Sequence, residues 1–266
     1  MVVGRLMAPV ATGGDSSWPA STLLGRLEHG ARDALLAAGR TVRFASGSYL
    51  LRQGETGSYV LLLLEGVVKV MTGTEDGFEG LLGLRVGGDL IGEMGALDGD
   101  PRSASVVAGT VVRARLIDQA ELRRVWSRHP DLQTEAIHVI SERLRRANER
   151  YIRFRTLGAA TRVCLLLVEL AERCGRPTPQ GCELILRLTQ GELASLAGVA
   201  LPTIEKALHS LAHDGLVLRQ YRHITIRDLD LLRARCNVHT KPTSRNPYQD
   251  GIAARGVGHH DSQRRD

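Results

Sequence analysis

The chain has 266 residues, a length that suits two domains with additional terminal tails. Its residues are 43% hydrophobic, but no apolar run reaches the ~18 residues needed to span a bilayer, and the N-terminus lacks the apolar segment of a signal peptide. We therefore expect a cytoplasmic protein that does not contact a membrane. The net charge of +6 permits phosphate binding but does not by itself establish it.

The cysteine pattern argues against a metal site. The four cysteines are Cys164, Cys174, Cys182 and Cys236, and they show neither C-x-x-C spacing nor a paired His cluster. An iron–sulfur cluster is held by several clustered cysteines, whereas the four cysteines here are widely spaced and none precedes Cys164. We therefore expect buried or half-buried thiols in a reducing cytosol, and no metal.

The N-terminal half is predicted to be rich in β-strands. Residues 1–20 contain much Gly, Ser, Ala and Pro without periodicity, which predicts a disordered arm. Apolar residues then recur at helical spacing from Leu23 to Ala38. Short β-rich runs and Gly-containing turns alternate over residues 41–116, and the apolar run Tyr59–Leu64 predicts a buried strand. We therefore assign residues 21–128 to a β-sandwich or β-roll.

One long helix is predicted from Pro130 to Arg155, a stretch without Gly or an internal Pro. Its apolar residues form two heptad rows, Ile137, Leu144 and Tyr151 in one and Ile140, Ala147 and Phe154 in the other. Two interlocked rows predict the seam of a parallel coiled-coil dimer, so residues 129–157 are interpreted as a dimerisation helix. The alternative is a single helix that packs on its own β-domain.

The C-terminal part is interpreted as a small helical domain over residues 158–235. A hinge is expected at residues 157–160, where Leu-Gly-Ala-Ala interrupts the heptad rows. A further apolar helix covers Val163 to Ala171, and residues 175–181 are expected to form a Pro/Gly loop. Residues 236–266 have little apolar content and predict a disordered tail.

Within this domain the pattern predicts a winged helix-turn-helix. Thr189 and Glu192 form a capping box at the start of a first short helix, and Gly198 provides a tight turn. A second helix follows from Pro202 to His213. A β-hairpin over residues 216–227 forms the wing, and the combination is more specific than the helix pair alone.

The second helix is expected to enter the major groove of DNA with its N-terminal residues facing the bases. The candidate DNA contacts are Thr189, Leu201, Pro202, Thr203, Glu205, Lys206 and His209, with Arg219, Tyr221 and Arg222 in the wing. Leu201 and Pro202 cannot make the bidentate hydrogen bonds by which Arg reads guanine. Lys206 is therefore the best candidate to touch a base, while the wing residues suit phosphate contacts.

Over residues 23–230 the chain resembles the cyclic-AMP receptor protein (CRP/FNR) family of bacterial transcription regulators. Besides the helix-turn-helix, the matching blocks are Gly47-Ser-Tyr-Leu-Leu-Arg-Gln-Gly-Glu, Leu63-Leu-Glu-Gly-Val-Val-Lys-Val, Gly88-Asp-Leu-Ile-Gly-Glu-Met and Arg102-Ser-Ala-Ser-Val. The resemblance implies an α+β fold: an N-terminal cyclic-nucleotide-binding β-roll, a long dimerisation helix and a C-terminal winged helix-turn-helix.

The resemblance also implies a ligand site in the roll, a phosphate-binding cassette made of Gly92, Glu93, Met94, Arg102, Ser103 and Ala104. Arg102 would bind the cyclic phosphate, whose single negative charge and oxygens match a guanidinium. Glu93 would accept a hydrogen bond from the ribose 2′-OH. The alternative is that Glu93 and Arg102 form a structural ion pair in a roll that takes no ligand.

The residues that would contact the base depart from the family pattern. Where family members present adjacent hydroxyl residues on the dimer helix, this chain has Ala147 and Asn148. Asn148 can both donate and accept, so it suits the amino edge of adenine or another base. Cyclic AMP is the first candidate effector, and cyclic GMP is the alternative.

Two functions remain open from the sequence. The first is a ligand-gated homodimer that binds double-stranded DNA and acts with RNA polymerase, as the resemblance implies. The second is a regulatory module that acts on a protein partner, with a degenerate reading helix, which Leu201 and Pro202 favour. We do not expect an enzyme, because no nucleophile–base pair and no metal-ligand cluster stands out.

Overall fold

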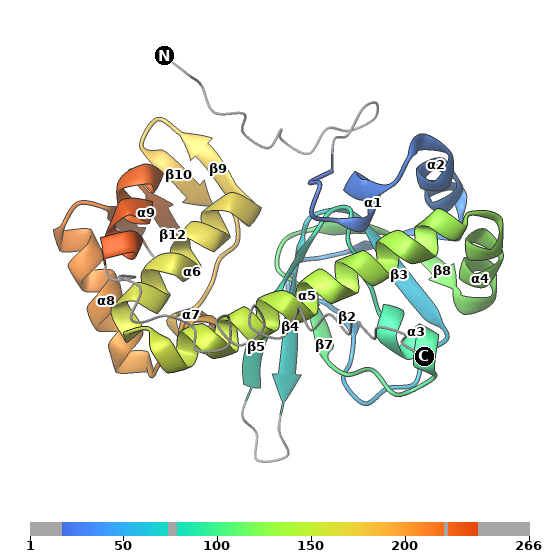
Figure 1. The fold of residues 1–266 in the computed structure, drawn as a ribbon, viewed down its shortest axis with the longest axis horizontal. Helices are drawn as coiled ribbons and strands as arrows, with labels where there is room; N and C mark the ends of the chain where they lie inside the picture. The colour runs from blue at the N-terminus through green and yellow to red at the C-terminus, as the bar shows by residue number, and fades with distance from the viewer. Residues whose placement is uncertain (1–17, 74–78, 221–222, 239–266) are drawn as a thin grey trace, which may run out of the picture.

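The computed structural model describes residues 18–73, 79–220 and 223–238. Figure 1 shows a β-roll and a smaller, mainly helical domain that lie toward opposite ends of one long helix, α5 (Pro130–Thr156). This arrangement confirms the predicted fold class. Most of the expected arm at 1–20 and of the expected tail at 236–266 lies outside the described residues.

The roll consists of two four-stranded antiparallel sheets whose strand orders are β1-β8-β3-β6 and β2-β7-β4-β5. Their bounds are β1 (Arg40–Phe44), β2 (Tyr49–Leu51), β3 (Tyr59–Glu65), β4 (Val67–Gly73), β5 (Glu79–Val86), β6 (Leu90–Ile91), β7 (Ser105–Ala108) and β8 (Val112–Asp118). The facing sides of the sheets enclose an aliphatic core, to which Leu51, Val68, Val106 and Val112 contribute. The predicted roll is therefore confirmed.

Strand β3 is apolar from Val60 to Leu64, and both of its faces are covered. Leu61 and Leu63 point into the core between the sheets, whereas Val60 and Leu62 belong to a second core beneath the surrounding helices. All four side chains are fully buried. This confirms the buried strand that the run Tyr59–Leu64 predicts.

Four short helices accompany the roll: α1 (Leu23–Arg26), α2 (His29–Ala37), α3 (Glu93–Asp98) and α4 (Gln119–Arg128). The helical spacing from Leu23 to Ala38 belongs to two helices and not to one. The chain is extended at Leu27, which is buried against the core beneath the helices. The chain therefore changes direction at the buried Leu27, and apolar spacing alone does not reveal this break between the two helices.

Helix α5 has two differently packed faces. On one face of α5, Leu132, Ala136 and Val139 are buried against the roll. Glu135 of α5 also forms an ion pair with Arg26 of α1, with 2.7 Å between Glu135 Oε2 and Arg26 Nε. The heptad residues Ile137, Leu144 and Tyr151 are each 62% exposed. Among the described residues, neither this helix nor any other is long and apolar enough to cross a membrane.

The second domain begins after a break at Leu157 and Gly158, as the hinge predicts. Its elements are α6 (Ala159–Cys174), β9 (Gly175–Thr178), β10 (Gly181–Leu184), α7 (Gln190–Ala197), α8 (Leu201–His213), β11 (Val217–Gln220), β12 (His223–Ile226) and α9 (Leu229–Val238). The helix pair α7–α8 and the hairpin β11–β12 confirm the predicted helix-turn-helix and wing.

The prediction of a loop at residues 175–181 is wrong, because β9 and β10 form a second hairpin there. This hairpin extends the wing sheet, whose strand order is β11-β12-β10-β9. Strand β9 lies at the edge of this sheet, where a proline can be accommodated. Pro177 therefore fits β9, although Pro and Gly in the sequence suggested a loop.

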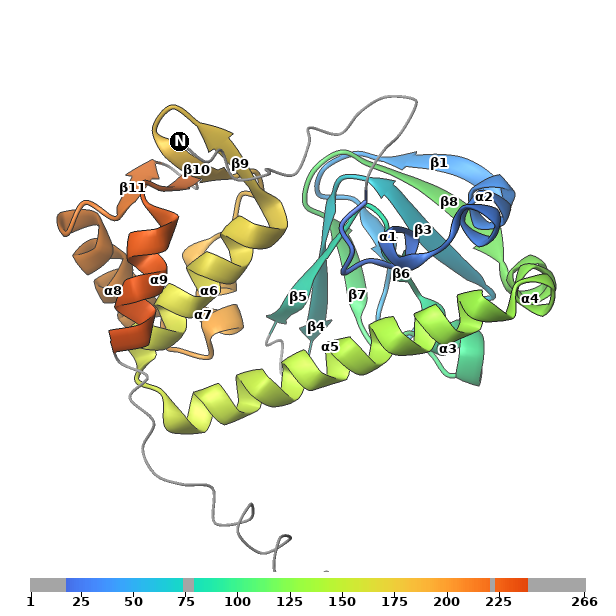
Figure 2. The same ribbon diagram turned by 45° about the horizontal axis from the view of Figure 1, so that its top comes forward.

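The two domains touch through β4, β5 and α7, while α5 passes beneath both (Figure 2). The Leu81 N–H of β5 donates to Ser195 Oγ of α7 at 2.9 Å. Lys69 Nζ of β4 lies 2.6 Å from Glu192 Oε1. Leu81 and Leu84 also join the core of the C-terminal domain. The described conformation therefore holds the C-terminal domain against the roll.

Candidate ligand pocket and nucleic-acid interface

Arg102 is the buried cation of the predicted ligand site, with only 5% of the residue exposed. Its Nη1 donates to the Gly92 carbonyl and its Nη2 to the Tyr59 carbonyl, each at 2.6 Å. The Tyr59 ring centroid lies 5.1 Å from the guanidinium carbon. Among the described residues, no carboxylate forms an ion pair with Arg102. Carbonyl dipoles and an aromatic ring alone therefore accompany this charge.

Two glycines allow the backbone to approach Arg102 closely. A Cβ atom at Gly57 would lie 2.7 Å from Nη2, and one at Gly92 would lie 2.7 Å from Nη1. Gly92, the N-cap residue that precedes α3, also has a φ of 77°, a conformation that side chains disfavour. Larger residues at either position would displace the guanidinium.

Backbone hydrogen bonds hold the Arg102 segment of the predicted cassette against residues 54 and 55. The Arg102 N–H donates to the Glu55 carbonyl at 2.9 Å, and the Arg102 carbonyl accepts from the Gly54 N–H at 2.8 Å. Ser103 Oγ lies 3.9 Å from Met94 Sδ, and both side chains are exposed. Ala104 is half-buried. The Arg102–Gly92 hydrogen bond and the Ser103–Met94 contact thus place the two segments of the cassette side by side.

Glu93 pairs with Arg143 of α5 and not with Arg102. Arg143 Nη1 lies 2.5 Å from Glu93 Oε1, and its Nη2 lies 3.1 Å from Asp89 Oδ1. Asp89 in turn accepts from the Val86 N–H at 3.0 Å. Arg143 is a residue of α5 that the heptad pattern does not single out. The structure makes it the link between that helix and the cassette.

Asn148 lies further along α5, and its side chain is exposed. The neighbouring Ala147 is exposed as well and lines a cavity between the two domains. No hydrogen bond in the described part of the chain ties Asn148 to the cassette. Its role as a base contact stays a prediction.

The candidate DNA contacts on α8 share one exposed face. Leu201, Pro202, Glu205, Lys206 and His209 are exposed and Thr203 is half-buried, whereas Ile204, Leu208 and Leu211 anchor the opposite face in the core. Gly198, with a φ of 61°, makes the turn that precedes α8. Of the wing candidates, Arg219 is exposed, while Tyr221 and Arg222 lie outside the described residues.

Gln190 joins this face although sequence analysis did not select it. When its amide is oriented to satisfy both neighbours, the nitrogen donates to Glu205 Oε1 at 2.7 Å and the oxygen accepts from Arg219 Nη2 at 2.6 Å. Gln190 therefore links α7, α8 and the wing. Its partners lie far apart in the sequence, so spacing gives no signal for this bridge.

Replacing Thr189 by alanine should lower the free energy of unfolding by about 1 kcal/mol, because the residue caps α7. Thr189 Oγ1 accepts from the Glu192 N–H at 3.1 Å, and Glu192 Oε2 accepts from the Thr189 N–H at 2.8 Å, which confirms the capping box. Chemical denaturation measures the change, with Thr189→Ser as the control that keeps the hydroxyl. Equal stability of Thr189→Ala and the unaltered chain would contradict this role.

Family models match both domains. The cyclic nucleotide-binding domain matches residues 41–129, and the Crp-like helix-turn-helix domain matches residues 161–235. A CRP-like cAMP-activated global transcriptional regulator of Mycobacterium tuberculosis is 31% identical over 209 residues, which cover 79% of this chain and 93% of that protein. The cAMP-activated global transcriptional regulator CRP of Salmonella typhimurium is 26% identical, over 69% of this chain and 88% of that protein.

Solved structures show the same architecture. A CRP/FNR-family transcriptional regulator of Thermus thermophilus matches with a TM-score of 0.64 at 26% identity, over 75% of this chain and 100% of that one. The c-di-GMP responsive regulator CLP of Xanthomonas campestris matches with a TM-score of 0.65 at 22% identity, over 76% of this chain and 100% of that one. These relatives are transcription regulators and not enzymes. The chain belongs to the CRP/FNR family of ligand-responsive, DNA-binding transcription regulators.

Proposed function

We propose that the roll binds a cyclic nucleotide, with cyclic AMP as the first candidate and cyclic GMP as the alternative. The observation that carries this proposal is the buried Arg102 guanidinium, which has no carboxylate partner among the described residues. Two of its five N–H groups donate to carbonyls, and the others could donate to phosphate oxygens. A bound anion would offset the cost of burying this charge.

The surrounding residues would hold the rest of the nucleotide. In this proposal the Ser103 hydroxyl and the backbone around Gly92, Met94 and Ala104 donate to the phosphate, and Glu93 accepts from the ribose 2′-OH. Arg143 Nη1 already pairs with Glu93 Oε1, and a carboxylate offers further acceptor positions for a ligand hydroxyl. Asn148 is the proposed base contact. The Mycobacterium tuberculosis and Salmonella typhimurium relatives are both named as cAMP-activated, which favours cyclic AMP.

The proposed regulator is a homodimer in which residues 21–128 sense the ligand, residues 129–157 dimerise and residues 158–235 bind DNA. The heptad residues exposed on α5, among them Leu144 and Tyr151, support a partner helix. A two-fold dimer would present two copies of α8 to successive major grooves, so we expect a pseudo-palindromic site with half-sites ~34 Å apart. We also propose that the DNA-bound dimer acts through RNA polymerase.

Replacing Lys206 by alanine should relax base preference at one position of each half-site by about 1–3 kcal/mol. Lys206 is exposed on the reading face of α8, where the neighbouring Leu201 and Pro202 offer no bidentate readout. Titration of operator variants that differ at single positions measures this preference. Arg123→Ala removes one positive charge from α4 of the roll and serves as the control. If Lys206→Ala shows the same base preference at every operator position as Arg123→Ala, Lys206 does not read a base.

The second candidate function is regulation of a protein partner without sequence-specific DNA reading. Leu201, which is 47% exposed, and Pro202 at the start of α8 favour it, because an exposed apolar turn also suits a protein surface. Selection of genomic fragments with and without cyclic AMP separates the two functions. Enrichment of one motif supports DNA reading, whereas recovery of random fragments supports the second function.

A further inference from the structure

The side chain of Gln190 connects an acidic residue of the reading helix with a basic residue of the wing. Its amide nitrogen donates to Glu205 Oε1 of α8 at 2.7 Å, and its amide oxygen accepts from Arg219 Nη2 of β11 at 2.6 Å. Glu205 and Arg219 are exposed, whereas Gln190 is half-buried. One neutral amide therefore holds a carboxylate and a guanidinium on the surface that would face DNA.

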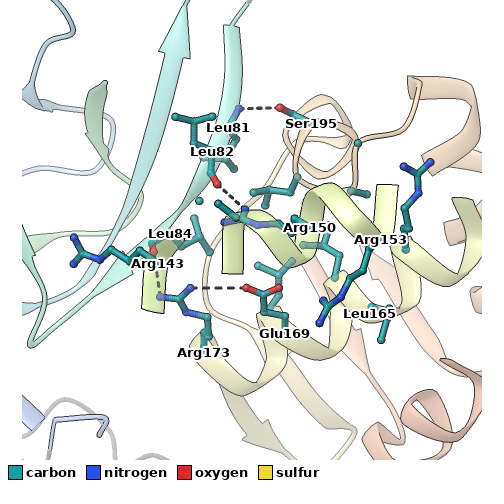
Figure 3. A pocket seen from close by; sticks show the side chains of 18 of the residues that line it. Leu81, Leu82, Leu84, Arg143, Arg150, Arg153, Leu165, Glu169, Arg173 and Ser195 are labelled. Carbon is teal, nitrogen blue, oxygen red and sulfur yellow. Dashed lines mark hydrogen bonds and ion pairs between the residues drawn. The ribbon is translucent and has the colours of Figure 1, made fainter. Parts of the chain in front are cut away.

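This bridge lies wholly within the C-terminal domain. Gln190 is the first residue of α7, and two later residues of the same helix contact the roll. Glu192 pairs with Lys69 of β4, and Figure 3 shows Ser195 directed toward Leu81 of β5. Gln190 instead bonds only to α8 and to the wing. The bridge therefore does not depend on how the two domains contact each other.

Glu205 is the unexpected member of the bridge, because a carboxylate on a DNA-facing helix repels the phosphates of every sequence. It is exposed in the same turn as Lys206, whose charge attracts those phosphates. A hydrogen bond from a base would offset the repulsion, but only at sites that present a donor at the right place. Glu205 therefore suits discrimination between sequences and does not suit overall affinity.

The chemistry of a carboxylate restricts which base it can meet. An ionised carboxylate only accepts hydrogen bonds, and guanine and thymine present only acceptors to it in the major groove. Adenine presents a donor beside the acceptor N7, a pair that an amide matches better than a carboxylate does. Cytosine presents its N4 amino group as a donor. Because Gln190 engages Oε1 of Glu205, Oε2 is the atom that would meet this single donor.

We propose that Glu205 selects a cytosine in each half-site of the operator and that Gln190 positions it, an inference that rests on the proposed DNA-binding function. Gln190 restricts the rotation of the Glu205 side chain before DNA is bound, so less side-chain freedom is lost on binding. The remaining N–H groups of Arg219 would donate to a phosphate beside this base. Its positive charge would thereby offset the negative charge of Glu205.

Selection from a library of random double-stranded DNA, by the full chain with and without cyclic AMP, measures the base preference at each operator position. We expect cytosine to be preferred about tenfold at one position of each half-site, since the other bases lose a charge-assisted hydrogen bond. Glu205→Gln should change this preference to adenine, because an amide matches both N6 and N7. The new side chain can still accept from Gln190, so the substitution tests the base contact and retains the bridge.

Gln190→Met tests the positioning role, because methionine has a similar length but lacks the amide that links Glu205 with Arg219. We expect the preference for cytosine to fall by about threefold to tenfold at that one position. The preferences at the other positions and the midpoint of thermal unfolding should stay unchanged. A role limited to stability would instead lower the unfolding midpoint and leave the cytosine preference as it is.

Glu172→Gln is the matched control, since Glu172 is an exposed glutamate of α6 that pairs with Arg233 of α9 at 2.7 Å. It removes the same charge from the C-terminal domain and should leave every base preference unaltered. If the unaltered chain enriches no motif, DNA reading itself fails and the cytosine assignment fails with it. If a motif is enriched but Glu205→Gln changes only the overall affinity, DNA reading stands and Glu205 specifies no base. An unchanged cytosine preference in Gln190→Met, or equal losses at all positions, would overturn the positioning role.

Discussion

Replacing Arg102 by alanine should reduce cyclic-nucleotide binding by at least tenfold and remove it at micromolar ligand. The cyclic phosphate would lose the one buried cation that the cassette offers, and a hydrogen bond to a charged group contributes about 1.5–3 kcal/mol. Several such bonds to one phosphate are lost together. Calorimetry with cyclic AMP and cyclic GMP measures the change, and it also decides which nucleotide the unaltered chain prefers.

The control for Arg102→Ala must separate ligand binding from stability, since Arg102 also satisfies two carbonyls. Removing it leaves the Gly92 and Tyr59 oxygens without these partners, which should lower the free energy of unfolding by about 1–3 kcal/mol. Arg102→Lys keeps the charge but loses the planar fork, so we expect intermediate affinity. Arg52→Ala, at an exposed arginine of the roll, should bind as the unaltered chain does.

Two results would contradict the Arg102 assignment. If the unaltered chain binds neither nucleotide at millimolar concentration, the roll is not a cyclic-nucleotide sensor. If Arg102→Ala remains folded by circular dichroism and binds normally, the phosphate is held elsewhere. The 2′-deoxy form of cyclic AMP adds a test of Glu93, because it lacks the hydroxyl that would donate a hydrogen bond to this carboxylate.

Local patterns predicted the features that neighbouring residues determine. The capping box at Thr189 depends on a residue three positions away, and the exposed row of Ile137, Leu144 and Tyr151 on α5 follows a repeat of seven. The buried strand β3 follows from its continuous apolar run, which requires that both faces be covered. In each case the physical cause lies within one element, so the sequence alone carries the information.

Contacts between distant elements escaped prediction for the opposite reason. Arg143 and Glu93 are 50 positions apart, and Lys69 and Glu192 are 123 positions apart. An arginine on a helix flank looks like an ordinary solvated residue until the roll is placed beside it. Only the tertiary fold brings these charges together.

The structure connects the proposed ligand site with the helix that would dimerise. Arg143 reaches from α5 to Glu93 and Asp89, so a ligand that engages Glu93 would act on α5 directly. The reading domain in turn contacts β4 and β5 through Lys69 and Ser195. Ligand binding can therefore alter DNA affinity only by as much as it favours one arrangement of these contacts over another.

Replacing Leu144 and Tyr151 by aspartate should convert a dimer into a monomer and should weaken operator binding by at least a hundredfold. Each of these residues is 62% exposed in the single chain, so the substitutions disturb few contacts within the protomer. In a coiled-coil seam the same carboxylates would be buried without partners, which costs several kcal/mol per charge. A monomer would engage one half-site and lose the gain in affinity that two linked reading helices provide.

Light scattering should then report the mass of one chain for Leu144→Asp/Tyr151→Asp and of two chains for the unaltered protein. Arg145→Asp introduces the same side chain on α5 outside the heptad rows, and we expect it to remain dimeric. Thermal unfolding must show that the double variant is folded, as the exposure of both side chains predicts. If the double variant stays dimeric, the heptad rows do not form the dimer seam. In that case the alternative holds, and α5 is a single helix that packs on its own roll. If it is monomeric but binds the operator unchanged, each reading domain acts alone and the site need not be palindromic.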